Sequence, residues 1–149
     1  VVTFLEKPLD YEELKTKLAV LGGSSVISEN TRPITKDTVL IEEGTTSKEM
    51  YWVLNGSFIT TKKSDVEGQD QIIGEIGAGE LIGEMSFLDS KSRSASVTAL
   101  EDSEVLVIPH RKFVHTMDKL PRWLQTLMKT LSLRLRNSNE LITHPKEKK

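Results

Sequence analysis

The chain changes its hydrophobic pattern twice along its length. Residues 1–25 contain an apolar repeat at helical spacing, residues 26–108 hold short β-rich runs separated by turn residues, and residues 109–143 return to helical spacing. Residues 144–149 are almost wholly polar and are predicted to form a tail. The pattern predicts a single domain that is mainly β. In it, an antiparallel β-roll of the jelly-roll kind lies between a leading helix and two C-terminal helices.

The β-rich part is predicted to contain six strands. Asn55-Gly56 is the strongest turn signal, and it predicts a hairpin between the second and third strands, with Trp52 and Phe58 as core residues on its two sides. The strands are predicted at residues 38–42, 50–54, 57–61, 71–76, 96–100 and 104–108.

Helices are predicted on both sides of the roll. The leading helix spans residues 10–21, Pro109 begins a short helix to about residue 117, and Pro121 begins a long one to about residue 143. A helix of this length exceeds what a small roll needs to cover itself, so part of its apolar stripe is predicted to contact a second subunit or a neighbouring domain. The stripe consists of Leu124, Leu127, Met128, Leu131, Leu135 and Ile142, with Ser138 interrupting it.

Composition adds several exclusions. With 149 residues, 37% of them hydrophobic and 28% charged, the chain can form one core. It contains no cysteine, which excludes disulfides, thiol catalysis and cysteine zinc sites. No apolar run is long enough for a membrane span and no signal-peptide pattern opens the chain, so a cytoplasmic location without a membrane partner is expected. The chain begins at Val1 instead of Met, which favours a piece of a longer protein.

The net charge of −2 conceals an asymmetry between two parts of the chain. Residues 1–109 hold 10 Lys+Arg and 19 Asp+Glu, whereas residues 110–149 hold 10 and 3. The division coincides with the end of the predicted roll. It indicates a two-part architecture whose acidic and basic parts can attract each other.

Residues 77–96 form the segment with the clearest chemistry. Gly77, Gly79 and Gly83 allow tight backbone turns and the close approach of a ligand. A single helical turn over residues 84–88 is predicted to present free N–H groups, which attract an anion.

Two charged residues in this segment suggest what that anion is attached to. Arg93 stands among the small residues Ser92, Ser94 and Ala95, which leave room beside its guanidinium for a pair of phosphate oxygens. Glu84 would repel a phosphate, but its carboxylate can accept hydrogen bonds from sugar hydroxyls. A ligand that carries a phosphate and a sugar satisfies both residues, although residue chemistry alone also fits an ordinary polar loop.

The segment resembles the phosphate-binding cassette of the cyclic nucleotide-binding domain family. Gly83-Glu84-Met85-Ser86, followed by Arg93-Ser94-Ala95, matches the family's motif, and the order of helices, turns and glycines matches over about residues 10–142. The resemblance implies that Arg93, Ser94 and Ala95 bind the phosphate and that Gly83 and Glu84 bind the ribose.

The resemblance also implies the residues around the base. Ser138 and Asn139 match two polar residues that contact adenine in the bacterial catabolite activators. Ser138 can alternatively be a neutral interruption of a partly exposed helix. The remaining pocket residues are expected to be Ile73, Ile76 and Met85.

Two departures from the family pattern are visible. Ser92 stands where some eukaryotic members have proline, so the loop before Arg93 is expected to be looser. The family's transcription factors continue into a helix-turn-helix domain that this chain lacks, so no nucleic-acid partner is expected.

Asn139 near the base favours cAMP over cGMP, although Ser94 could contact a guanine amino group.

The expected function is that of a non-catalytic sensor with no cofactor or metal. It would transmit the binding of a cyclic nucleotide through its C-terminal helix to a partner subunit in a homodimer or to an attached effector. His110 and His115 do not share a helix face, which argues against a metal-dependent jelly-roll enzyme, and no nucleophile–base pair is recognisable. The rival is a nucleotide-free docking module of the same fold. The basic residues Lys129, Arg134, Arg136 and Lys146–Lys149 are interpreted as a solvated face and tail.

Overall fold

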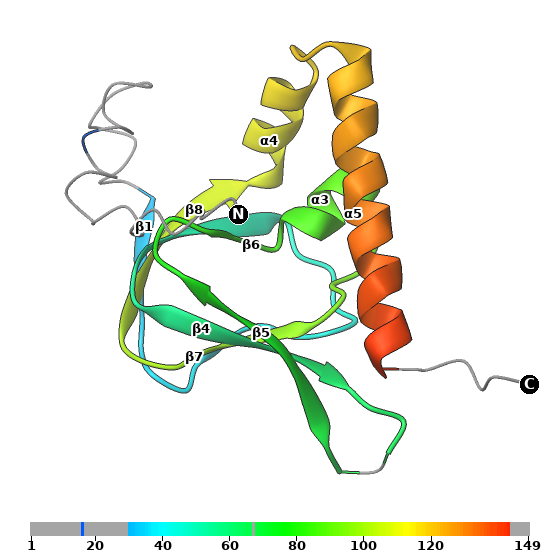
Figure 1. Cartoon of the computed structure of the whole chain (residues 1–149). Coiled ribbons are helices and arrows are strands. Elements are labelled where there is room, and N and C mark those ends of the chain that lie inside the picture. The colour runs from blue at the N-terminus through cyan, green and yellow to red at the C-terminus, as the bar shows by residue number, and fades with distance from the viewer. Residues whose placement is uncertain (1–15, 17–29, 67, 144–149) are drawn as a thin grey trace, which may run out of the picture.

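The computed structural model describes residue 16 and residues 30–66 and 68–143. The leading helix predicted over residues 10–21 therefore lies, apart from residue 16, outside the described residues, as does the tail at residues 144–149. The described part contains a β-roll, a short helix inserted in it and two C-terminal helices (Figure 1). The predicted fold class is confirmed.

The roll consists of two four-stranded sheets with antiparallel pairing throughout. One sheet has the order β1-β8-β3-β6 and the other the order β2-β7-β4-β5. All six predicted strands are present, and two short strands, β1 and β6, were missed. The strands are β1 (Thr31–Ile34), β2 (Val39–Ile41), β3 (Glu49–Asn55), β4 (Ser57–Lys63), β5 (Asp70–Gly77), β6 (Leu81–Ile82), β7 (Ser96–Ala99) and β8 (Ser103–Pro109).

The hairpin predicted at Asn55-Gly56 is wrong, because β3 and β4 lie in different sheets. β3 pairs with β6 and β8, while β4 pairs with β5 and β7. Gly56 has φ 96°, and a Cβ there would overlap Ser103, so the turn packs closely against the start of β8. The turn therefore carries the chain from one sheet to the other, and the hairpin is the one between β4 and β5.

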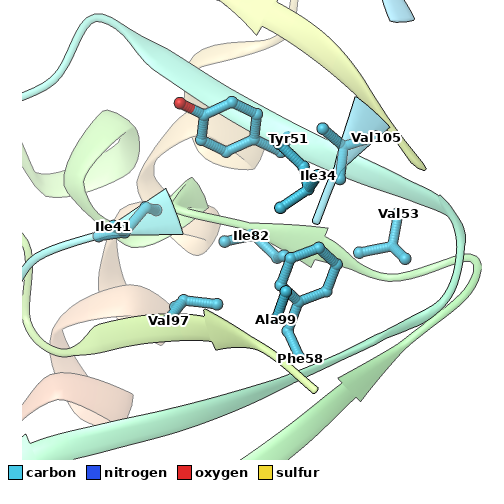
Figure 2. Close-up of a cluster of buried hydrophobic side chains, with 9 residues drawn as sticks. All are labelled: Ile34, Ile41, Tyr51, Val53, Phe58, Ile82, Val97, Ala99 and Val105. Atoms are coloured by element: carbon cyan, nitrogen blue, oxygen red, sulfur yellow. The ribbon is translucent and has the colours of Figure 1, made fainter. Parts of the chain in front are cut away.

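The core lies between the two sheets, which both supply its side chains (Figure 2). Phe58 is fully buried there, as predicted. Trp52 alternates along β3 with Tyr51 and Val53, so it faces the other side of its strand and is not part of this cluster. The cluster consists of Ile34, Ile41, Tyr51, Val53, Phe58, Ile82, Val97, Ala99 and Val105.

Three helices accompany the roll in the described residues: α3 (Glu84–Asp89), α4 (His110–Met117) and α5 (Arg122–Thr143). The long α5 packs against α3, which lies between it and the roll (Figure 1). Its stripe is partly uncovered in the single chain, since Leu127, Leu131 and Leu135 are all exposed, Leu131 at 54%. None of the described helices combines the length and apolar character that crossing a membrane requires.

Candidate functional site

A cavity of about 380 Å³ opens beside α3. This volume lies within the range of about 300–1,000 Å³ that is usual for small-molecule sites. β4 and β5 of one sheet, the segment from Glu80 to Ala95 and the C-terminal half of α5 all contribute side chains to it. Nine of the ten residues singled out in the sequence line it: Ile73, Ile76, Gly83, Glu84, Met85, Arg93, Ser94, Ala95 and Asn139.

Ser138 is the exception among the candidate residues. It is exposed on α5 and does not line the cavity, whereas Leu135 and Asn139 do. Residues four apart share a helix face, while neighbouring residues are turned by about 100°. Ser138 thus points away from the cavity in the single chain, as the interpretation as a neutral interruption predicts.

Gly83 places the start of α3 against Arg93. Its backbone has φ 84°, and a Cβ at this position would overlap the guanidinium of Arg93 and crowd the side chain of Ile41. A residue with a side chain would therefore be strained and would also displace the arginine. The glycine that the motif requires has a direct steric reason in this structure.

Arg93 is buried to 3% exposure although it is a cation. Its Nη1 donates to the Gly83 carbonyl at 2.7 Å and to Ser86 Oγ at 2.8 Å, and its Nη2 donates to the Glu49 carbonyl. Its Nε has no hydrogen-bond partner among the described residues. The guanidinium also lies 5.7 Å from the ring centre of Phe87 on α3.

The charge of Arg93 has no direct counterpart in the part of the chain that the structure describes. No carboxylate there forms an ion pair with it. Burial lowers the pKa of its guanidinium, and the nearby Tyr51, Glu84 and Glu49 only partly oppose that effect. A cation that is buried without an ion-pair partner is costly, so the site is suited to an anion.

Glu84, the first residue of α3, lines the same cavity as Arg93. Burial raises the pKa of its carboxyl, while a hydrogen bond from its own backbone and the charge of Arg93 oppose the rise and Glu80 adds to it. Glu84 and Arg93 thus offer an acceptor and a positive charge to one cavity. The cavity therefore suits a ligand with both hydroxyl and anionic groups.

The described residues contain three buried cationic side chains, and two of them donate to the carbonyls on either side of the third, Arg93. Arg136 of α5 donates to the Ser92 carbonyl at 3.1 Å, and Lys62 of β4 donates to the Ser94 carbonyl at 3.0 Å. Arg93 lies between them. The interpretation of Arg136 as part of a solvated face is therefore wrong, since it turns inward onto this segment.

Arg136 also forms a two-pronged ion pair with Asp89, the last residue of α3. Its Nε and Nη2 lie 2.7 and 3.0 Å from the two carboxylate oxygens. The side chains of Arg136 and Asp89 are 8% and 1% exposed. One turn earlier on α5, Ser132 Oγ donates to the Met85 carbonyl at 3.3 Å. The helix is thereby attached to both ends of the segment that holds Glu84 and Arg93.

Several cavity residues were missed in the sequence. Thr60 lies on a predicted strand and Glu80 in a predicted loop, but the sequence did not show that their side chains line the cavity. Leu135 was assigned only to the apolar stripe of the long helix. Leu135 lies four residues before Asn139, so the helical spacing could have identified it. The carbonyl of Glu49 could not be foreseen, because a backbone acceptor leaves no signal in the sequence.

The described part of the chain contains no group of three or more His, Asp or Glu residues that could hold a metal ion. His110 packs against Phe87 with ring centres 4.8 Å apart, at the junction of α4 with α3. The imidazole there serves packing between the two helices.

The family comparison agrees with this geometry. Residues 31–119 match the family model described as the cyclic nucleotide-binding domain. The "Cyclic AMP receptor protein" of Thermus thermophilus is 33% identical over 97 residues, which cover 65% of this chain and 44% of that protein. The chain spans about half or less of the length of this relative and of the similar regulator from Haemophilus influenzae.

Solved structures show the same similarity. The EAL enzyme Bd1971 in its cAMP-bound form has a TM-score of 0.69 and 29% identity, and the match covers 73% of this chain and 29% of that one. The cGMP-bound form of that enzyme gives a TM-score of 0.66. The catabolite activator protein of Thermus thermophilus gives 0.63 with 28% identity and covers 87% of this chain and 57% of that one.

Proposed function

Because the chain belongs to the cyclic nucleotide-binding domain family, we propose that it is a non-catalytic sensor of a cyclic nucleotide. The ligand would lie in the cavity beside α3, with its phosphate at Arg93, Ser94 and Ala95 and its ribose at Gly83 and Glu84. The base would meet the apolar wall and Asn139.

The observation that carries this proposal is the buried positive charge of Arg93, which no carboxylate of the described residues pairs. Arg136 is paired with Asp89, and Lys62 has Glu43 at 3.8 Å, but Arg93 has no carboxylate partner in the described part of the chain. A cyclic phosphate carries one negative charge and two exposed oxygens, which a guanidinium binds well. The binding of such a ligand would remove the cost of burying Arg93.

We further propose that cAMP is preferred over cGMP. Asn139 lines the cavity from α5, and its side-chain amide can both donate to and accept from an adenine edge. Ser94 offers a single hydroxyl to a guanine amino group, and that hydroxyl already faces Met85 Sδ at 3.7 Å. The relative Bd1971 has been solved with either nucleotide, so the preference must be measured on this chain.

The output of the sensor is proposed to pass through α5. Leu135 and Asn139 of this helix line the same cavity as Arg93, so a bound nucleotide would touch the roll and the helix together. The exposed Leu127 and Leu131 suit contact with a second subunit or an attached effector domain.

Two of the relatives are named as transcriptional regulators, so the comparisons do not support the exclusion of nucleic acid made from the sequence. The cytoplasmic location remains a prediction.

Titration calorimetry of the chain with cAMP, cGMP and 5′-AMP tests the proposal. We expect cAMP to bind more tightly than cGMP, and 5′-AMP to bind weakly because its phosphate is not cyclised. Tighter binding of cGMP would refute the preference but keep the sensor. The absence of heat and of any thermal shift with both cyclic nucleotides at millimolar concentration would refute the sensor and favour the rival docking module.

A further inference from the structure

Arg136 occupies a position that links the helix to the nucleotide site through the backbone. The backbone around Arg93 is held by hydrogen bonds to other segments: its own N–H donates to the Thr45 carbonyl at 2.9 Å, and its carbonyl accepts from the Gly44 N–H at 2.9 Å. The carbonyl on either side of it is held by a buried cation, Arg136 before and Lys62 after. The place of the Arg93 guanidinium is thus set by partners outside its own loop.

Lys62 and Arg136 make equivalent contacts from different parts of the molecule. Lys62 belongs to β4, a strand in the middle of its sheet. Arg136 belongs to α5, and its ion pair with Asp89 spans 47 residues of sequence. Movement of α5 away from the roll would therefore release the Ser92 carbonyl and Asp89 at the same time, whereas the Lys62 contact would stay.

We propose that Arg136 is a positioning residue for the nucleotide, which makes the docking of α5 and the binding of phosphate at Arg93 one coupled event. The proposal rests on the proposed function and adds the residue that couples the site to the helix. When the Arg136 fork engages Asp89 and the Ser92 carbonyl, the residue next to Arg93 is fixed and α5 closes the cavity with Leu135 and Asn139. When the Arg136 guanidinium is absent, the docking of α5 and the binding of phosphate at Arg93 are no longer linked by these contacts.

The test compares Arg136→Gln with Lys62→Gln, and Arg134→Gln on the exposed face of α5 serves as the control. Calorimetry measures cAMP affinity, and circular dichroism checks folding. The chain has no cysteine, so cysteines introduced at the exposed positions Lys36 and Asn137 can carry spin labels that report the distance between the roll and α5. Dilution with unlabelled chain removes distances between subunits.

Arg136→Gln is expected to weaken cAMP about tenfold or more, since charge-assisted hydrogen bonds of this kind contribute on that scale. It is also expected to broaden the label distance toward longer values, and saturating cAMP should restore the wild-type distance. Lys62→Gln should weaken cAMP while leaving the distance unchanged, and Arg134→Gln should change neither.

Wild-type affinity in Arg136→Gln would overturn the proposal, and so would lost affinity with an unchanged label distance. If Arg136→Gln does not fold, Arg136→Lys can be used instead. It keeps the positive charge but loses the two-pronged ion pair with Asp89, so it should change the cAMP affinity and the label distance in the same direction by smaller amounts. If the wild-type chain binds neither cyclic nucleotide, the proposed function fails. In that case the label distances without nucleotide still show whether Arg136 docks α5, and an unchanged distance there overturns the proposal separately.

Discussion

Replacement of Arg93 by alanine should separate the effect of this residue on nucleotide affinity from its effect on folding. The side chain is buried, and without it a bound phosphate would lose its only direct cationic partner in the proposed site. Removal of one member of a buried ion pair costs about 3–5 kcal/mol, which corresponds to a loss of affinity of at least about a hundredfold. Calorimetry with cAMP measures the loss directly.

The same substitution should have a small effect on the chain without nucleotide. Alanine removes the hydrogen bonds that Arg93 donates to Gly83, Ser86 and Glu49, each contributing on the order of 1 kcal/mol. It also removes a buried charge that has no ion-pair partner among the described residues, which offsets that loss. The melting temperature without nucleotide should therefore change by only a few degrees.

Thermal unfolding with nucleotide then gives a clear contrast. At a concentration of 100 times Kd, cAMP should stabilise the wild-type chain by about 2.7 kcal/mol, or roughly 5–10 °C for a domain of this size. At the same concentration a hundredfold weaker variant gains about 0.4 kcal/mol, or roughly 1 °C. Arg134→Ala, at an exposed position on α5, should keep the full shift. An Arg93→Ala variant with affinity within tenfold of wild type would refute the assignment of Arg93 to the phosphate.

Four further substitutions test other parts of the structure. Gly83→Ala should destabilise the fold by about 1–2 kcal/mol through its positive φ and should also weaken cAMP by displacing Arg93. Gly68→Ala has a similar φ but open space around its Cβ, so it should show the strain without loss of affinity. The pKa of Glu84 is raised in the folded chain, so its contribution to stability should be complete below about pH 4.5 and decline as the pH rises toward the folded pKa. The wild-type free energy of unfolding minus that of Glu84→Gln should fall over this range, and a difference that rises or stays flat would contradict the burial effect. If the chain forms the proposed dimer through α5, Leu131→Glu should weaken self-association in sedimentation experiments and leave the melting temperature nearly unchanged, and unchanged association would exclude this face from the proposed dimer.

The strands could be predicted because each depends on a short local pattern. Alternating apolar residues and turn signals located six strands within a few residues of their observed ends. Their partners were harder to predict, because pairing depends on contacts between distant segments. Asn55-Gly56 favours a tight turn in any context, but the hydrogen bonds of β3 and β4 go to β8 and β7, and so the turn joins two sheets.

The site divides in the same way. The glycines, Glu84 and Arg93 could be singled out because their residue types and spacing match the motif of a known family, although residue chemistry alone also fits a polar loop. The carbonyls that receive Arg93 and the position of Ser138 were not, since a backbone acceptor has no residue type and a one-residue step on a helix changes the face.

Arg136 shows why the most informative contact was the hardest to predict. On an amphipathic helix a lone arginine beside exposed leucines is normally interpreted as a solvated residue, because burial of a cation is unfavourable unless a counter-charge meets it. That counter-charge, Asp89, lies 47 residues earlier on a short helix against which α5 packs, and its side chain is 1% exposed. The burial of either residue therefore depends on the other and on the docking of the helix, which no local pattern contains. For the same reason the pair can report whether α5 is docked: neither charge can remain buried and satisfied once the helix leaves the roll.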